Sequence, residues 1–292
     1  MRNNKDSLGD RMKGYENISR IYLTRRTPII IRIDGKAFHS FTRGFARPFD
    51  DVLIKSMQNT AKYLCENIMG CKLAYTQSDE ISLLLVDYEK IETQAWFDNN
   101  LQKMVSVAAS MATMAFNKHF RNSVDQWNSE KFPIDYLGAV NRNLDETFME
   151  DLKLKEKYIS AVNKGAMFDA RAFILPKEEV NNYFIFRQQD ATRNSIQMVA
   201  QSNFSQKELQ GKSCDVLQDM LHKQKGINWN DCPTVYKRGS CIIKVYDVIT
   251  QYDEVGNICG YTERTKWIVD KEIPAFTQDR NYINKYVMLE EN

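Results

Sequence analysis

Runs of apolar residues, interrupted by polar segments, mark candidate strands along the chain. Residues 28–33 and 81–86 are apolar almost throughout, which is typical of strands covered on both faces. Another strand begins near residue 71, so that residues 77–80 form the polar centre of a hairpin. Residues 167–175 supply a further strand.

Apolar residues spaced three or four apart predict helices over residues 8–22, from about 48 to 69, and over residues 99–120. Ser205 followed by Glu208 matches a capping box, which predicts one more helix start. We expect the first helix to pack on the sheet through a single apolar stripe, formed by Leu8, Met12, Tyr15, Ile18 and Tyr22.

The order of these elements predicts the fold class. A hairpin inserted between helices, with a further helix opening at Pro176, indicates an α+β fold: a mixed sheet with helices on one face, as in ferredoxin-like proteins and polymerase palms. We expect residues 1–240 to form a palm-like catalytic domain with a polar insertion near 119–165. Residues 241–292 are expected to add a β-hairpin, with its turn around 256–257, and a tail packed on the core or on a neighbouring subunit.

Composition narrows the class of protein. Of the 292 residues, 27% are charged and 43% hydrophobic, which is usual for a globular chain of one or two domains. The net charge of +2 is small, so nucleic-acid binding would need a local basic patch. The six cysteines form no CxxC pair and no zinc pattern with the three histidines. With no apolar run of membrane-spanning length, we expect a reduced, cytoplasmic protein without a membrane segment.

Acidic residues stand at the ends of two predicted strands. Asp34 follows the first strand, and Asp79 and Glu80 lie at the centre of the hairpin. In a split βαβ sheet these strand ends can be neighbours, and two carboxylates beside the open carbonyl of Gly35 are hard oxygen ligands suited to Mg²⁺. Two such ions can support phosphoryl transfer. Asp-Gly and Ser-Asp-Glu are also common turn sequences, so the pattern alone leaves plain turn chemistry open.

The segment after Asp34 combines small and basic residues. Residues 35–39 could turn backbone N–H groups toward a triphosphate, and Lys36, His39, Arg43 and Arg47 add positive charge. No GxxxxGK[ST] motif occurs, so this is not a P-loop. A lone histidine such as His39 is more often a structural residue than a ligand.

Five separated motifs together resemble one family. "RIDGKAFHSFTRGFARPFDD", "AYTQSDEISLLL", "FDARAF", "FRQQDATRNS" and "YKRG" are similar, in the same order, to the histidine tRNA guanylyltransferase superfamily of 3′-to-5′ nucleotide-adding polymerases. The resemblance covers residues 28 to about 240. It implies a palm-like core, two or more Mg²⁺ ions, ATP or GTP as activating substrate, a tRNA or tRNA-like RNA extended at its 5′ end, and a homotetramer.

The resemblance also implies roles for individual residues. Asp34, the carbonyl of Gly35 and Asp79 would bind metal, and Glu80 would be a supporting catalytic acid. The positions that match the family's nucleotide site are Gly35, Lys36, Ala37, Phe38, His39, Arg47, Asp50 and Ser78.

One departure selects a branch of the family. The histidine-tRNA enzymes of eukaryotes carry His-Ile-Asn-Asn where this chain has Thr192, Arg193, Asn194 and Ser195, so that only Asn194 matches. The chain resembles instead the guanylyltransferase-like branch, whose members resemble template-directed tRNA 5′-end repair enzymes. Candidates for contact with RNA or a second nucleotide are Arg187, Gln188, Asp190, Arg193, Asn194, Lys237 and Arg238. For Gln188 and Asp190 a structural polar network is the alternative.

We therefore expect a template-directed nucleotidyltransferase that adds nucleotides to the 5′ end of tRNA or a tRNA-like RNA. Three alternatives remain: a histidine tRNA guanylyltransferase adding a single G, a palm-fold nucleotide cyclase, and a non-catalytic RNA-binding module. The presence of Asp34, Asp79 and Glu80 together argues against the last of these.

Overall fold

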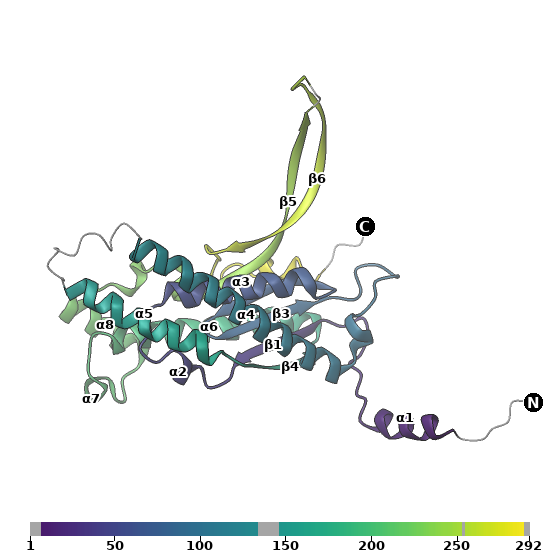
Figure 1. Cartoon of the computed structure of the whole chain (residues 1–292), viewed down its shortest axis with the longest axis horizontal. Helices are drawn as coiled ribbons and strands as arrows, with labels where there is room; N and C mark the ends of the chain where they lie inside the picture. The colour runs from purple at the N-terminus through teal and green to yellow at the C-terminus, as the bar shows by residue number, and fades with distance from the viewer. Residues whose placement is uncertain (1–6, 134–145, 253–254, 289–292) are drawn as a thin grey trace, which may run out of the picture.

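Six strands form a single sheet in the order β4-β1-β3-β2-β5-β6 (Figure 1). The computed structural model describes residues 7–133, 146–252 and 255–288. The strands are β1 (Ile29–Gly35), β2 (Cys71–Gln77), β3 (Glu80–Leu85), β4 (Phe168–Ile174), β5 (Ser240–Tyr252) and β6 (Ile258–Asp270).

The sheet has the predicted split βαβ arrangement, because β3 lies between β1 and β2 and runs antiparallel to both. The prediction of a mixed sheet is wrong, since every neighbouring pair of these six strands is antiparallel. The two parallel strands β1 and β2 are separated by β3, so they share no hydrogen bonds. In this register Asp34 lies directly opposite Glu80.

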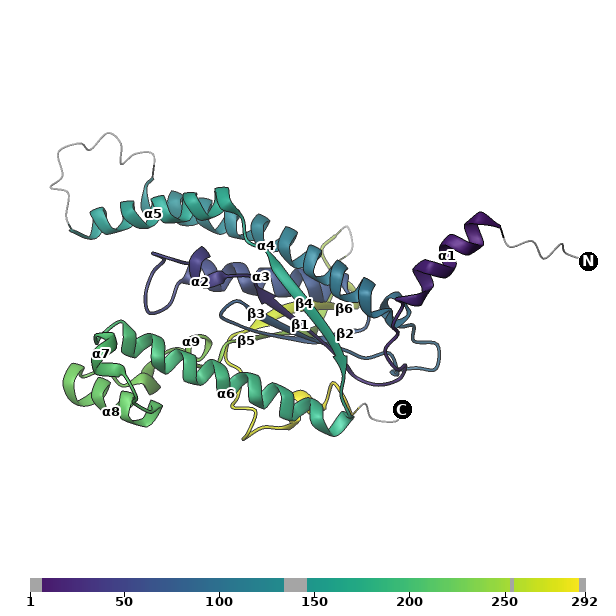
Figure 2. The same ribbon diagram turned by 90° about the horizontal axis from the view of Figure 1, so that it is seen from below.

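Helices cover both faces of the sheet, which corrects the prediction of helices on one face (Figure 2). Helices α3 (Asp51–Asn67) and α4 (Leu101–Lys131) cover one face, and α6 (Lys177–Gln201) covers the other. The cause lies in the strands, whose residues are apolar on both sides. Ile31 packs in the core under α3 and α4, whereas its neighbour Ile30 packs in the core that includes Phe184 of α6.

The first helix, α1 (Leu8–Ile18), does not pack on the sheet as expected. None of its residues is buried, and Figures 1 and 2 show it extending away from the body of the molecule. Ile18 is 81% exposed and Tyr15 is 69% exposed. The helix also ends at Ile18, so Tyr22, the last residue of the predicted stripe, lies outside it. Periodicity therefore identified the first four residues of the stripe, but a stripe does not specify which surface covers it.

Residues 119–165, expected to be a polar insertion, consist largely of two helices. Helix α4 continues to Lys131, and α5 (Glu146–Lys164) packs against it; residues 134–145 lie outside the described part of the chain. The shorter elements are α2 (Phe38–Phe41), η1 (Trp96–Asn99), α7 (Gln206–Leu209), α8 (Cys214–Lys225), η3 (Trp229–Asp231), α9 (Thr234–Arg238) and α10 (Asn281–Asn284). The capping box at the start of α7 is confirmed.

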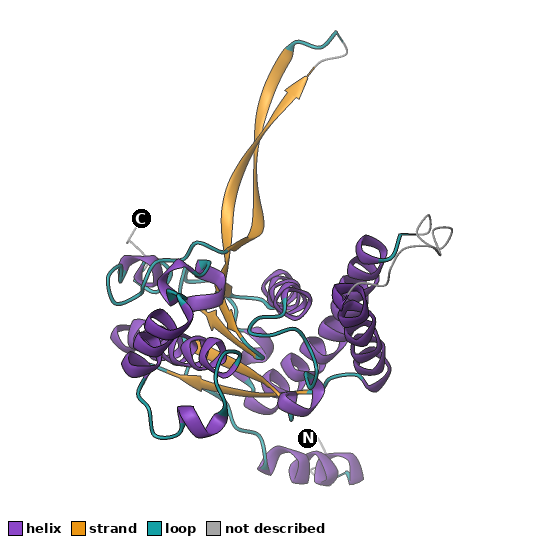
Figure 3. Cartoon of the chain, turned by 90° about the vertical axis from the view of Figure 1, so that its left-hand side faces the viewer, coloured by secondary structure: helices purple, strands orange, loops and turns teal. Residues whose placement is uncertain are grey.

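Strands β5 and β6 form the predicted C-terminal hairpin, which begins in the sheet beside β2 and projects far beyond it (Figure 3). After the hairpin, Ile273, Phe276 and Ile283 are buried in the core beneath α6. The division into units at residue 240 stays a prediction. None of the described helices combines the length and apolarity needed to cross a membrane.

Candidate functional site

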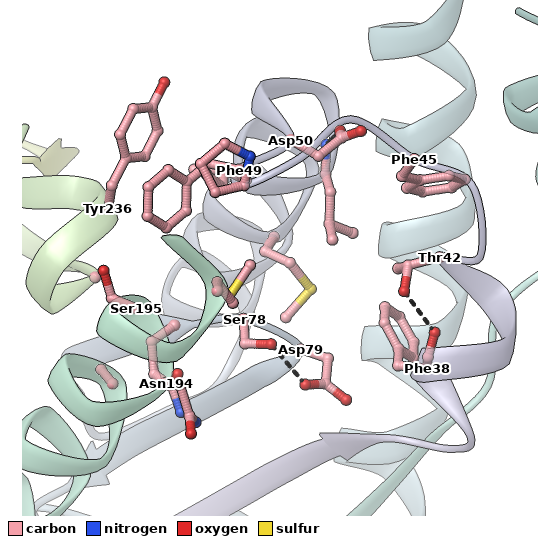
Figure 4. Close-up of a pocket in the computed structure, with 18 of the residues that line it drawn as sticks. Phe38, Thr42, Phe45, Phe49, Asp50, Ser78, Asp79, Asn194, Ser195 and Tyr236 are labelled. Carbon is pink, nitrogen blue, oxygen red and sulfur yellow. Dashed lines mark hydrogen bonds between the residues drawn. The ribbon is translucent and has the colours of Figure 1, made fainter. Parts of the chain in front are cut away.

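A cavity of about 810 Å³ lies where β1 ends and the β2–β3 hairpin turns (Figure 4). One wall is formed by α2, the loop that follows it and the start of α3. The hairpin turn forms the floor, and α6 with α9 forms the opposite wall. Residues that line it include Gly35, Phe38, His39, Arg43, Arg47, Asp50, Ser78, Asp79, Asn194, Ser195 and Tyr236.

The ends of the two acidic strands lie side by side, and of their acids Asp79 lines this cavity. The N–H of Gly35 donates to the backbone oxygen of Asp79 over 3.1 Å, which joins the end of β1 to the hairpin turn. Asp79 lines the cavity, and its carboxylate accepts a hydrogen bond of 3.0 Å from Ser78 Oγ. Burial, and secondarily the negative charge of Asp34, raise the pKa of Asp79.

Asp34 is not among the residues that line the cavity. Its carboxylate pairs with Arg32 at 2.8 Å and lies 3.7 Å from Arg171. Arg32 also contacts Glu80 at 2.9 Å, so one guanidinium links the acid at the end of β1 to the acid that opens β3.

Glu80 is a buried acid rather than a cavity residue. It is 4% exposed, and Arg187 of α6 donates to it over 2.8 Å. Burial raises the pKa of Glu80 although Arg187 and Arg32 oppose the shift. The position suits a support for the neighbouring Asp79, because the Glu80 side chain fastens the hairpin to α6.

The segment after β1 is shaped by a glycine and an aromatic anchor. A Cβ on Gly35 would lie only 2.1 Å from the ring of Phe38, so no larger residue fits without displacing that ring. Phe38 is itself held between Phe116 and Phe168, with ring centroids 5.5 and 5.2 Å away. Ala37 has a left-handed backbone, with φ of 53°.

This anchored segment presents hydrogen-bond donors and positive charge. Within the described residues, no hydrogen bond engages the backbone N–H groups of residues 37–39. His39, Arg43 and Arg47 are exposed and line the cavity, and neither arginine has a carboxylate partner among the described residues. Lys36 is exposed but does not line the cavity, and its N–H bonds to the backbone oxygen of Met167. The arrangement therefore suits an anionic ligand in the cavity.

Asp50, predicted to bind nucleotide, holds the loop together. Its carboxylate accepts from the N–H of Ala46 at 3.0 Å, from the N–H of Leu53 at 2.8 Å and from the hydroxyl of Tyr158 at 2.7 Å. It thus caps α3 and ties the loop to α5. Burial raises its pKa above the usual range.

Of the residues proposed to contact RNA, the first two on α6 are buried. Arg187 pairs with Glu80, and the side-chain amide of Gln188 bonds to the backbone of Pro274 and Phe276, each over 2.9 Å. For Gln188 this is the structural network that the sequence left open as the alternative. Asp190 accepts from the exposed Arg193 over 2.8 Å.

Asn194 lines the cavity and remains the α6 residue best placed for a ligand. The two residues on α9, Lys237 and Arg238, make contacts within the chain. The Lys237 ammonium group donates to the backbone oxygen of Asn230 and lies over the ring of Trp229. The carbonyl of Lys237 accepts from Thr192 and that of Arg238 accepts from the buried Tyr75.

The sequence did not point to two aromatic residues in the wall. Phe49 and Tyr236 stack with ring centroids 4.5 Å apart, and the Tyr236 hydroxyl donates to Asp51 over 2.6 Å. They lie far apart in the chain, and no local pattern joins them. Beside them, Gly239 has φ of +78°, and a Cβ there would lie 2.4 Å from the backbone oxygen of Thr76.

The donor set near Asp79 fits a hard cation. Asp79 and the Gly35 carbonyl offer oxygen ligands, which Mg²⁺ prefers. The carboxylate of Asp34, in contrast, is paired with Arg32 and would have to leave that ion pair to join them. The described residues contain no group of three or more His, Cys, Asp and Glu side chains able to hold a metal, so further ligands would come from substrate and water.

Comparison with known proteins identifies the family. A sequence model of tRNA(His) guanylyltransferase matches residues 9–176, more than half of the chain. The tRNA(His) guanylyltransferase of Debaryomyces hansenii is 28% identical over 247 residues, covering 80% of each chain. An uncharacterized protein of Acanthamoeba polyphaga mimivirus is 26% identical over 250 residues, covering 82% of this chain and 77% of that one.

Two solved structures are more similar still. A bacterial tRNA(His) guanylyltransferase-like protein in complex with ATP is 45% identical, with a TM-score of 0.72 and coverage of 96% of this chain and 99% of that one. Such a protein in complex with GTP is 43% identical, with a TM-score of 0.71 and coverage of 97% and 100%. The chain therefore belongs to the tRNA(His) guanylyltransferase family, which is a family of nucleotidyltransferases.

Proposed function

We propose that this protein is a template-directed 3′-to-5′ nucleotidyltransferase that adds nucleotides to the 5′ end of tRNA or a tRNA-like RNA. The observation that carries the proposal is the pairing of two groups at one cavity. The acidic turn at Asp79 lies on the floor, and the exposed Arg43 and Arg47 line the wall. A nucleoside triphosphate requires both a metal-binding acid and neutralising cations.

The reaction needs no side-chain nucleophile. ATP or GTP first activates the 5′-monophosphate of a truncated RNA: an oxygen of that phosphate attacks the α-phosphorus of the triphosphate and pyrophosphate leaves, giving a nucleotidylated end, and a triphosphorylated end is the other activated form. The 3′-hydroxyl of the incoming nucleotide then attacks the activated 5′ phosphate. A phosphodiester forms, and the mononucleotide or pyrophosphate leaves with the bonding electron pair.

This chain's residues contribute positioning and charge. Asp34, Asp79 and the carbonyl of Gly35 would hold magnesium, which when bound supplies a Lewis acid beside the reacting phosphate. The free N–H groups of residues 37–39, with Arg43 and Arg47, would orient the triphosphate and stabilise its charge. Asp50 holds that loop in place by accepting hydrogen bonds from the N–H of Ala46 and the hydroxyl of Tyr158.

The solved relatives support ATP and GTP as ligands, since their structures contain one or the other. A histidine tRNA guanylyltransferase that adds a single G fits the same family match and is the second candidate. We prefer the first because residues 192–195 depart from the His-Ile-Asn-Asn of the eukaryotic histidine-tRNA enzymes at every position except Asn194. We further propose a palm-type core and a homotetramer.

The test uses a 5′-monophosphorylated tRNA lacking its first nucleotide, with magnesium, ATP and GTP. The wild type is expected to extend the 5′ end, and Asp79→Asn to lose at least about 100-fold in rate. Lys90→Gln, on a loop at the opposite end of β3, is the matched control and should remain active. Conversion of triphosphates alone, without RNA extension, would replace this proposal with a cyclase; RNA binding without any turnover would indicate a binding module.

A further inference from the structure

One face of α5 carries exposed lysines that the reaction at the cavity leaves without a role. Lys153, Lys157 and Lys164 are all exposed, and none has a carboxylate partner within 4 Å among the described residues. They are spaced four and seven residues apart, which places them on the same side of the helix. At about 1.5 Å per residue they span roughly 16 Å.

This face adjoins the rim of the cavity. The aliphatic stem of Lys157 lies about 3.1 Å from where a Cβ on Gly44 would be, directly beside Arg43 in the loop. Arg43 and Arg47 likewise lack carboxylate partners in the described part of the chain. The three lysines and two arginines therefore form one group of cations, the α5 strip, that leads outward from the cavity.

The α5 strip is fixed in register with the cavity. Tyr158, the neighbour of Lys157, is 1% exposed and donates to Asp50, which in turn holds the loop that carries Arg43 and Arg47. Glu146 and Glu150 lie on the lysine side of α5 but in its first turns, where acids favour the helix dipole. The positive stretch accordingly begins at Lys153.

We propose that the α5 strip binds the phosphate backbone of the RNA whose 5′ end occupies the cavity. This inference rests on the proposed function. A row of unpaired, solvated cations suits phosphates, which it would contact without reading sequence. The end of an RNA chain cannot enter the cavity without its next phosphates leaving past the rim, and the α5 strip lies at that rim.

The test measures RNA binding and its salt dependence by fluorescence anisotropy with a 5′-monophosphorylated tRNA. In the triple variant Lys153→Gln, Lys157→Gln, Lys164→Gln, the slope of log K against log salt should become shallower by about 2, since each phosphate contact contributes roughly 0.7 to 0.9. Affinity should fall several-fold at moderate salt, while ATP binding and the melting temperature stay unchanged.

The matched control removes three exposed lysines elsewhere, Lys13→Gln, Lys90→Gln and Lys271→Gln, with the same change in net charge. If both triple variants show the same slope and affinity, the α5 strip is not the RNA surface. Loss of ATP binding together with RNA binding would also overturn the inference, by placing the effect in the cavity. If the α5 triple variant binds anionic lipid vesicles less well than the wild type but binds RNA equally well, the surface serves a membrane instead.

The two proposals can fail separately. A wild type that binds RNA through the α5 strip yet adds no nucleotide would remove the proposed function alone. A wild type that extends RNA while the α5 triple variant behaves like the control would remove the strip alone.

Discussion

At the scale of single residues, the burial of Asp79 lowers the stability of the folded protein at neutral pH. Burial and the nearby charge of Asp34 raise its pKa above the ordinary 3.8. A carboxyl whose folded pKa is raised stabilises the fold only while protonated, below pH 3.8, and that contribution is lost as the pH rises through the folded pKa. At neutral pH the ionised group is therefore a cost that a bound cation would offset.

Replacing Asp79 by asparagine should therefore stabilise the protein at neutral pH in the absence of divalent ions, because Asn resembles the neutral acid. The gain should shrink as the pH falls toward 3.8, where wild-type Asp79 becomes protonated. Urea denaturation across this pH range measures it. Magnesium should stabilise the wild type and not the variant; a variant that is less stable at neutral pH without metal would contradict this account.

Gly35→Ala tests the close approach of Phe38. The added Cβ would meet a ring held in an aromatic cluster, so we expect a loss of about 1–3 kcal/mol and impaired nucleotide binding. Gly14→Ala, which has open space around it in the exposed α1, should change stability by no more than about 0.5 kcal/mol. Equal denaturation midpoints for the two variants would show that the Phe38 ring can yield.

Only part of the candidate site could be predicted from the sequence, because some of its contacts join segments that are far apart in the chain. Asp34 and Asp79 end apolar strands, and strand ends in a split βαβ sheet meet, so their proximity followed from local pattern. Gln188 looked equally suited to contact a ligand or the protein. Its pairing with the backbone near Phe276 depends on a chain segment 88 residues away, which no local pattern reveals.

At the scale of elements, the ion pair between Glu80 and Arg187 fastens the β2–β3 hairpin to α6. Both side chains are nearly inaccessible, at 5% and 6%. Removing one partner from such a pair leaves a buried charge without compensation.

Arg187→Met is accordingly expected to destabilise the protein by about 3–5 kcal/mol. The matched control, Arg193→Met, removes an arginine six residues later on α6 that is 58% exposed and pairs with Asp190. It should cost no more than about 1 kcal/mol. Chemical denaturation compares them, and a small effect at Arg187 would mean that α6 is held by its apolar contacts alone.

Most strands and helices could be predicted from the sequence, but the helices that cover each face of the sheet could not. Strands β1 and β3 are apolar runs bounded by polar residues, and helix α3 has apolar residues spaced three or four apart. Helix α6 covers the second face of the sheet. Its buried residues include apolar ones such as Val180 and Phe184 and polar ones such as Asn181. That mixture weakens the periodicity from which a second layer could be predicted.

At the scale of the whole molecule, two projections leave apolar side chains in solvent. On α1, Tyr15 and Ile18 are exposed, and on the β5–β6 hairpin Tyr246 and Tyr261 are 79% and 67% exposed. Patches of this kind mark contacts with other chains. They are consistent with the proposed homotetramer, in which these surfaces would be covered.

Sedimentation should therefore give a mass near four chains, and Tyr246→Ser with Tyr261→Ser should shift it toward smaller species. Both tyrosines lie outside the cavity, so ATP binding should persist. A single-chain mass for the wild type at micromolar concentration would refute the tetramer without touching the proposed chemistry.

The most direct test of the central claim is the choice of nucleotide. The base opposite the missing first position of a truncated, 5′-monophosphorylated tRNA is varied through all four possibilities, and each nucleotide is offered in turn with magnesium and ATP. The account predicts that the added nucleotide follows the opposing base. Addition of G regardless of that base would contradict it and identify the single-G histidine tRNA activity instead.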